Sequence, residues 1–370
     1  MVPASGADGA EAQPATAAWT PSQRAALSLS YLGYATCMLC KSAFDLSIPS
    51  IQLDATMALT HEATARMLSA GASAYMLGKL VGGSLSDIMG GGRTLAFTSI
   101  VTAAAFGVIV RARSLSALTV AWVLARLFMA SGYPAGTAIV GEHFEGTGLG
   151  LALGIFSTSS RGGAVLGSVV LGTLLSPTFG ISWRGVLGLG GALSLGVGAA
   201  VQFHPALRRS RPESQQLPAD AGSSGEADLD RVITKTAAEG ILALCKTGRL
   251  WLTMASTACL GPAFEFGAVL PLCLTSTHGM TPAVAAVMSG FYPLGAAVSL
   301  IVSGWLYDRL KPKQRAAYFG SLLLMAAGSL SLLTRSAGRP KWMLATCLFT
   351  TMFGVAPALC ESFASYTFSV

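Results

Sequence analysis

Long apolar runs fill most of this chain, and they restrict its fold more than any other feature of the sequence. A helix that crosses the hydrocarbon core of a bilayer needs about 20 predominantly apolar residues, and the sequence contains ten such runs. Their expected limits are 27–51, 66–86, 94–110, 116–140, 148–175, 184–203, 250–274, 282–306, 316–334 and 342–365. We therefore expect an all-α, polytopic membrane protein.

The composition argues against the soluble alternatives. Charged residues make up 11% of the chain, which is too few to keep a soluble surface hydrated and free of apolar patches. Disorder requires low hydrophobicity, yet 52% of the residues are hydrophobic. The net charge of +7 arises largely from basic residues in short loops between the apolar runs, where they act as topology signals. Enzymes of the soluble type and nucleic-acid-binding proteins are thus almost excluded.

Two polar segments divide the chain. Residues 1–25, rich in Ala, Pro, Ser and Gly, are expected to form a disordered cytosolic tail, and 204–249 a cytosolic central loop. Between them, 26–203 would form a six-helix bundle, and 250–370 an incomplete bundle of four helices. With the N-terminus in the cytosol, thirteen basic residues fall in inside segments and seven in outside segments. This bias predicts a cytosolic N-terminus, and the sequence leaves open which membrane the protein occupies.

A short motif occurs twice, at the ends of the second and eighth apolar runs. Both copies read G-x-L-x-D and are followed by basic residues, and their aspartates are separated by 221 positions (308 − 87). The residues concerned are Gly83, Asp87 and Arg93 in the first copy, and Gly304, Asp308 and Arg309 in the second. The repetition indicates two related halves, as in transporters built from repeated bundles.

This paired motif resembles the signature of the major facilitator superfamily. The resemblance implies a fold of two helical bundles with about ten of twelve spans present, and it predicts C-terminal truncation because the chain stops after the tenth run. It also implies that the six motif residues gate the cytosolic side by joining the inner ends of helices. An aspartate at a helix end is suited to cap a neighbouring helix or to pair with an arginine. The alternative is that these are ordinary solvated loop charges.

A narrower resemblance is to the organophosphate/inorganic-phosphate antiporter family. The stretch 31–49, which contains Tyr31, Tyr34, Lys41 and Pro49, is similar to the first helix of that family. The stretch Tyr75-Met-Leu-Gly78-Lys79 is similar to its second helix. Gly132-Tyr133-Pro134 and Gly354-Val-Ala-Pro357 match two further motifs of this family. The resemblance implies that Lys41 stands where the family has a substrate-binding arginine, and that Glu265 replaces a second one with reversed charge.

Ionisable residues inside the spans are costly in a membrane, so they are the best candidates for a functional site. Lys41 is placed to bind the anionic group of a substrate, although Asp45, four residues further along the same helix face, is an alternative partner. Arg161 is either a second substrate-binding cation or a partner of Asp45 or of a backbone carbonyl. Arg126 belongs to the coupling network, unless it snorkels to the membrane surface.

Glu265 is the most informative of these charges. Opposite Lys41, it would complete a site for a zwitterion, carry a proton, or form an ion pair that holds the two halves together. Two aromatic residues, Tyr34 and Tyr292, are further candidates for contact with the substrate.

These features predict a secondary active transporter of a small organic anion or zwitterion, either organophosphate-like, a carboxylate or an amino acid. It would work as a monomer in the lipid bilayer by alternating access, with proton coupling or exchange. No nucleophile–base pair, metal-ligand spacing or ATP-binding motif is visible, so we expect neither enzymatic activity nor a cofactor or metal. The alternatives are a non-transporting membrane sensor on the same scaffold and an inactive truncated transporter.

Overall fold

The structure is a computed structural model. It describes residues 19–57, 59–144, 147–176, 178–208, 248–307, 309–335 and 340–367. Most of the expected N-terminal tail, residues 209–247 of the expected central loop, and the motif residue Asp308 lie outside these described residues.

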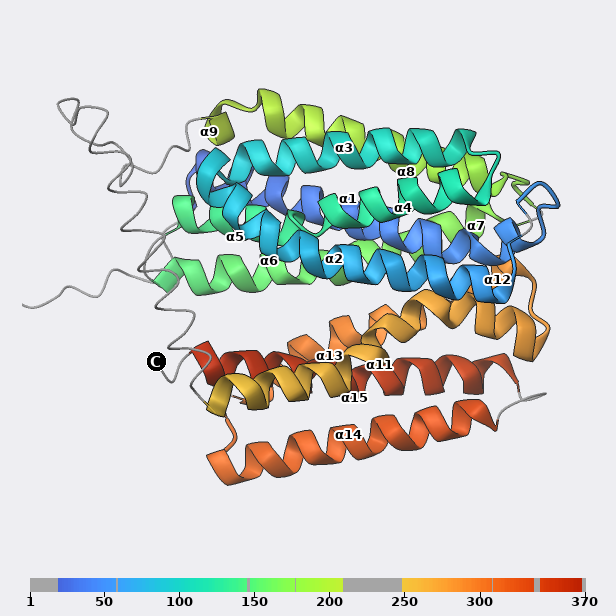
Figure 1. The fold of residues 1–370 in the computed structure, drawn as a ribbon. Helices are drawn as coiled ribbons and strands as arrows, with labels where there is room; N and C mark the ends of the chain where they lie inside the picture. The colour runs from blue at the N-terminus through green and yellow to red at the C-terminus, as the bar shows by residue number, and fades with distance from the viewer. Residues whose placement is uncertain are drawn as a thin grey trace, which may run out of the picture.

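The regular structure within the described residues is helical and contains no strand. One group of helices covers the first half of the chain and consists of α1 (Pro21–Gln52), α2 (His61–Met89), α3 (Gly91–Arg111), α4 (Leu115–Met129), α5 (Gly132–His143), α6 (Thr147–Leu166), the π-helix η1 (Gly167–Leu171), α7 (Gly172–Leu174), α8 (Trp183–Phe203) and α9 (Pro205–Arg208). The second half consists of α11 (Gly248–His278), α12 (Pro282–Ser289), α13 (Phe291–Tyr307), α14 (Pro312–Thr334) and α15 (Lys341–Thr367). In Figure 1 the first group forms the upper part of the molecule, and α11, α13, α14 and α15 form the lower part.

Each of the ten expected spans coincides with one helix or with consecutive helices. Within the described residues, five segments are long and apolar enough to cross a membrane by composition and length alone: Gly91–Arg111, Leu115–His143, Trp183–Phe203, Pro282–Ser303 and Gln314–Leu333.

Two spans are broken where a proline follows. The break between α4 and α5 precedes Pro134, and the break between α12 and α13 at Gly290 precedes Pro293. A proline has no backbone N–H and its ring collides with the carbonyl group four residues earlier, which interrupts the helix there. The fifth span contains a third irregularity, the π-helix η1.

The first helix begins earlier than the sequence predicted. Residues 21–25, placed in the disordered tail, are the first turn of α1. Thr20 caps this helix: its hydroxyl accepts a hydrogen bond from the Gln23 amide at 3.2 Å, and its own amide donates to the Gln23 side chain at 3.0 Å. Pro21 occupies the first helical position, where its missing N–H costs nothing.

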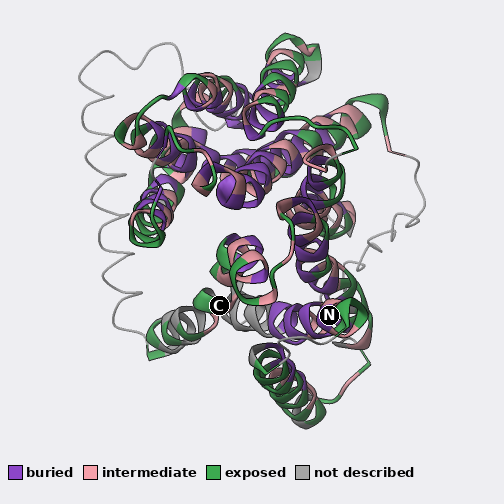
Figure 2. Ribbon diagram, turned by 90° about the vertical axis from the view of Figure 1, so that its right-hand side faces the viewer, coloured by how far each residue is buried: buried purple, intermediate pink, exposed green. Residues whose placement is uncertain are grey.

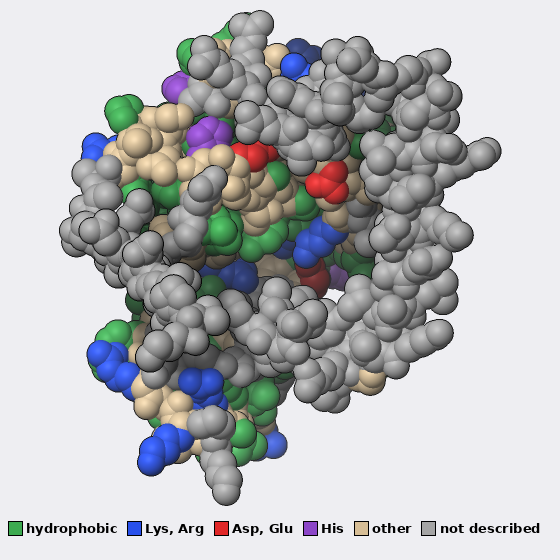
Figure 3. Space-filling model, turned by 90° about the vertical axis from the view of Figure 1, so that its left-hand side faces the viewer, with side chains coloured by type: hydrophobic (Ala, Val, Ile, Leu, Met, Phe, Trp, Pro, Cys, Tyr) green, Lys and Arg blue, Asp and Glu red, His purple; other side chains and the backbone are tan. Residues whose placement is uncertain are grey.

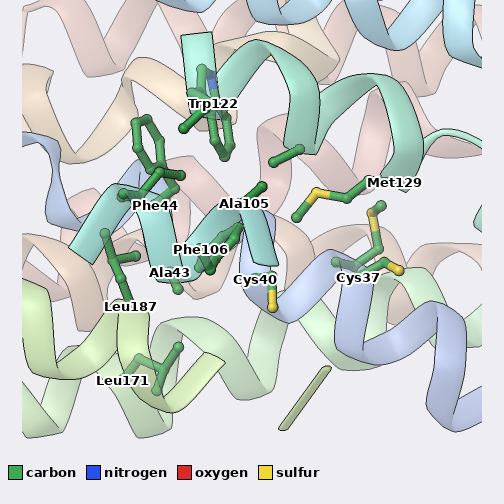
Figure 4. Packing of buried hydrophobic residues seen from close by; sticks show 14 of the residues in the cluster. Cys37, Cys40, Ala43, Phe44, Ala105, Phe106, Trp122, Met129, Leu171 and Leu187 are labelled. Atoms are coloured by element: carbon green, nitrogen blue, oxygen red, sulfur yellow. The ribbon is translucent and has the colours of Figure 1, made fainter. Parts of the chain in front are cut away.

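Each half has its own hydrophobic core. The core of the first half includes Phe44 of α1, which stacks on Trp122 of α4 with ring centroids 3.7 Å apart, as Figure 4 shows. Cys37 and Cys40 are free thiols in the same core. A second cluster joins α11, α12, α13, α14 and α15. Figure 2 shows buried residues on the inward faces of the helices, whereas α14, at the bottom of the view, is largely exposed.

The halves meet most closely at the end of the molecule remote from the termini, where α7 and α12 lie in Figure 1. There Gly172 packs on Ala286 and Gly290 packs on Ser168, and a Cβ atom added to either glycine would lie only 2.9 or 3.0 Å from its neighbour. Small residues at these points allow the backbones to approach. At the other end, which carries the termini, the surface is hollowed between the halves (Figure 3).

Candidate substrate site between the two halves

Lys41 and Asp45 form an ion pair in the middle of α1. They are four residues apart, so they lie on one face of the helix, and the Lys41 ammonium donates a hydrogen bond to Asp45 Oδ2 at 3.3 Å. The side chain of Lys41 is 20% exposed and that of Asp45 only 7%. Asp45 Oδ1 is buried and accepts no hydrogen bond from the described residues. The local partner of Lys41 anticipated in the sequence is therefore present, and the pair still has an unused acceptor.

Arg126, in the last turn of α4, is buried beside this pair. Its guanidinium lies 4.4 Å from the centre of the Tyr75 ring and 5.7 Å from that of Trp122, so two aromatic faces stabilise the cation. Its side chain is only 3% exposed, which shows that it does not snorkel to the membrane surface. Its Nη1 atom has no hydrogen-bond acceptor among the described residues.

Glu265 of α11 faces these cations from the other half of the molecule. Its Oε2 atom lies 3.9 Å from Lys41 Nζ, and its Oε1 atom lies 3.8 Å from Arg126 Nη2. The side chain is 50% exposed because it borders a cavity. The structure thus brings together four of the charges singled out in the sequence: Lys41, Asp45, Arg126 and Glu265.

Two cavities flank the Lys41–Asp45 pair. The first, of about 250 Å³, is lined by all four charges, by Trp122 and by apolar residues of α2 and α11. The second, of about 90 Å³, is bordered by Arg161 and Tyr292 together with three serines, Ser42, Ser168 and Ser289. Seen from the end that carries the termini, basic and acidic side chains lie within the hollow between the halves (Figure 3).

Arg161 and Tyr292 border the second cavity, as expected of substrate-site residues, but Tyr34 borders neither cavity. Tyr34 is buried in the first half, with its ring edge-to-face with Tyr133 at 5.4 Å and its hydroxyl 3.5 Å from that of Tyr75. Its helix face turns toward α5 and α6, and contact of Tyr34 with the substrate stays a prediction.

The sequence alone did not reveal the aromatic wall of the first cavity. Trp122 lines this cavity, and its Nε1 atom is buried without a hydrogen-bond partner among the described residues. Its position one turn before Arg126 is the only signal that the sequence offered, since the two side chains then share a helix face.

The family of the protein follows from comparison with known proteins. The family model described as Major Facilitator Superfamily matches residues 30–369. The chain belongs to the major facilitator superfamily. It is accordingly an integral, multi-pass membrane protein of a transporter family, and its all-helical fold agrees with this membership.

Relatives and solved structures agree with this assignment. A gallate transporter from Pseudomonas putida is 27% identical over 328 residues, covering 78% of this chain and 68% of the relative. A bacterial homologue of the human lysosomal transporter Spinster, in an inward-facing and occupied conformation, superposes with a TM-score of 0.66 at 15% identity. That match covers 95% of this chain and 79% of the other. The unoccupied form of the homologue gives 0.63 at 18% identity, covering 93% and 76%.

The superfamily motif lies at the open end of the molecule, and its first copy is not latched in this conformation. Asp87 and Arg93 are both exposed, and no hydrogen bond or ion pair joins them within the described part of the chain. Arg309 of the second copy folds back along its own segment, donating to the Trp305 carbonyl at 3.2 Å and stacking on the Trp305 ring at 3.7 Å. The gate function of all six motif residues stays a prediction.

At the closed end, Asp54 and Arg184 together link three segments of the first half. Its carboxylate accepts hydrogen bonds from the Thr56 hydroxyl at 2.6 Å, from Arg184 at 2.7 Å and from the Trp183 indole at 3.2 Å. These donors, the Thr56 hydroxyl first and Arg184 next, hold the pKa of Asp54 well below its usual range. Arg184 also donates to the carbonyl of Ala112 at 3.3 Å.

Proposed function

We propose that this chain is a secondary active transporter of a small organic anion that carries a carboxylate group. The observation that supports this most is the pair of cations, Lys41 and Arg126, beside the first cavity. Lys41 Nζ and Arg126 Nη2 both lie within 4 Å of the Glu265 carboxylate, and Arg126 Nη1 has no acceptor among the described residues. Two cations that converge at a cavity between helices favour a ligand with a negative charge.

A carboxylate suits the geometry better than a phosphate or a zwitterion does. Arg126 offers beside Glu265 the planar fork that binds an anion through two parallel hydrogen bonds, and one of its nitrogens has no acceptor among the described residues. Glu265, with its reversed charge, weakens the two-cation clamp that a phosphate would use. An amino acid would bring its own ammonium group close to Lys41 and Arg126, which disfavours it.

The aromatic wall further supports an aromatic carboxylate. Trp122 lines the cavity beside Arg126, and the ring of Tyr75 lies under the guanidinium. The related Pseudomonas protein is named for gallate, a hydroxylated aromatic carboxylate. The hydroxyl groups around the second cavity offer acceptors for such hydroxyls, because Ser168 and Ser289 already donate their protons within their own helices.

The other expectations from the sequence fit this proposal. We propose that the site descends from one like that of the organophosphate antiporters, with its clamp altered at Lys41 and Glu265. The cytosolic N-terminus belongs to the same proposal, as do the boundaries 26–203, 204–249 and 250–370, with the first bundle extended to Pro21 at its start. So do gating by the two motif copies, coupling through Asp45, and action as a monomer by rocking of the two halves.

Ligand-dependent stabilisation of the purified full chain tests this function. A ligand that binds the folded state raises its melting temperature by mass action. Benzoate and gallate should stabilise the protein, while benzamide, glycerol phosphate and alanine should have little effect. Stabilisation by phosphate esters or amino acids without an effect of carboxylates would contradict the proposal. Carboxylate binding without transport in proteoliposomes would instead indicate a sensor.

A further inference from the structure

The Glu265 carboxylate occupies the place where a substrate carboxylate would be bound. It spans Lys41 and Arg126, with one oxygen 3.9 Å from the first cation and the other 3.8 Å from the second. Among the ion pairs of the described residues, these two are the ones that join the first half of the molecule to the second.

The Glu265 carboxylate holds the two cations loosely. Both distances exceed the roughly 2.7–2.9 Å of a good charge-assisted hydrogen bond, whereas Asp45 binds Lys41 more closely at 3.3 Å. The side chain of Glu265 is half exposed to the cavity, so water solvates its carboxylate when it leaves the cations. Asp45 is thus the permanent partner of Lys41, and Glu265 is an exchangeable one.

We propose that Glu265 is an internal stand-in for the carboxylate of the substrate, which displaces it from Lys41 and Arg126 on binding. This inference rests on the proposed function. It explains how the carrier would cross the membrane both loaded and empty. In the loaded carrier the substrate carboxylate faces Lys41 and Arg126, and in the empty carrier the Glu265 carboxylate takes its place.

Loss of the carboxylate therefore changes the mode of transport. The empty site of a Glu265→Gln variant has one negative charge fewer than that of the empty wild type, and an unbalanced charge buried between closing helices is strongly unfavourable. The loaded variant has the same charge as the empty wild type, because the substrate carboxylate replaces that of Glu265, so it still crosses. The variant should exchange substrate for substrate but no longer return empty.

The test compares net uptake with exchange for the full chain in proteoliposomes, using labelled gallate as the probe. Net uptake is measured into liposomes without internal gallate, and exchange into liposomes preloaded with unlabelled gallate. The wild type should show both activities. Glu265→Gln should reduce net uptake at least tenfold, keep exchange within about threefold, and bind gallate more tightly because the competitor is gone. Glu62→Gln, which removes an exposed carboxylate paired only with Arg66 on α2, is the matched control and should behave as wild type.

The ways in which this test can fail are distinguishable. Two results would overturn the inference and leave the proposed function intact. One is undiminished net uptake by Glu265→Gln. The other is loss of both exchange and net uptake in that variant while gallate still stabilises it. A wild type that exchanges without net uptake would also overturn the inference. A wild type that neither binds nor transports any carboxylate would overturn the proposed function itself. If Glu265→Gln does not fold, Glu265→Asp serves: it keeps the charge and should retain net uptake, and a switch to pure exchange in that variant would count against the inference.

Discussion

Replacement of Arg126 is the most informative single perturbation of the proposed site. Arg126→Gln removes a positive charge that lies 3.8 Å from the nearest oxygen of Glu265 and is almost completely buried. At that separation two unit charges interact by about 4 kcal/mol at an effective dielectric constant of about 20, which is the attraction before the cost of desolvation is subtracted. After desolvation, a hydrogen bond to a charged group contributes about 1.5–3 kcal/mol.

The expected consequence is an affinity for benzoate or gallate that is about 10- to 150-fold weaker, since each 1.4 kcal/mol corresponds to about a factor of ten. Isothermal titration of the purified full chain measures this directly. Arg126→Lys keeps the charge but loses the planar fork, so it should give an intermediate affinity. Arg66→Gln on the exposed face of α2 is the control, because Arg66 is 77% exposed and pairs only with Glu62. An unchanged dissociation constant in a folded Arg126→Gln protein would refute this assignment.

Three further predictions concern a surface ion pair, helix packing and the aromatic wall of the site. Asp54→Asn should lower the melting temperature by a constant amount between pH 5 and 7, because the lowered pKa of Asp54 stabilises the fold fully above the ordinary aspartate pKa of about 3.9. This difference should shrink as the pH falls below about 4, and a difference independent of pH down to about 3 would show that the charge of Asp54 is not what stabilises the fold. Gly78→Ala should destabilise the protein by about 1–3 kcal/mol, since the new Cβ would lie 2.0 Å from the Leu127 carbonyl oxygen. Gly83→Ala is the control and should not destabilise the protein, because the space around Gly83 is open. Equal melting temperatures for the two variants would contradict this prediction. Trp122→Leu should weaken binding of benzoate about 2- to 10-fold more than that of acetate, as calorimetry can show, because an aromatic contact contributes about 0.5–1.5 kcal/mol beyond its buried area.

The fold was largely predictable because membrane insertion imposes strong rules on sequence. A spanning helix must be long and apolar, so the limits of the ten runs agree with the helices to within a few residues. The exceptions have local causes that hydropathy does not report: the Thr20 cap starts α1 early, and Pro134 and Pro293 divide two spans. The π-helix at 167–171 had no recognisable signal.

The site was predictable in its charges but not in its pairing. Buried ionisable residues are rare enough in a membrane protein that Lys41, Arg126 and Glu265 could be selected by type alone. Which of them meet depends on how α1, α4 and α11 are rotated, and this is set by packing across the whole bundle. The same limit explains Tyr34, whose position on α1 differs from that of Lys41 by nearly two helical turns but whose side chain faces the core. Trp122 was missed because an apolar aromatic residue inside a span carries no functional signal until its neighbours are known.

The most direct test of transport through this site is uptake of labelled gallate into proteoliposomes that contain the full chain. The result expected is saturable uptake that benzoate inhibits, that benzamide leaves unchanged because it lacks the negative charge, and that Arg126→Gln reduces at least tenfold. The central claim is that a carboxylate crosses the membrane while bound to the buried cations between the two halves. Uptake with the same concentration dependence in wild type and Arg126→Gln would contradict this claim. Equal inhibition by benzoate and benzamide would contradict it as well.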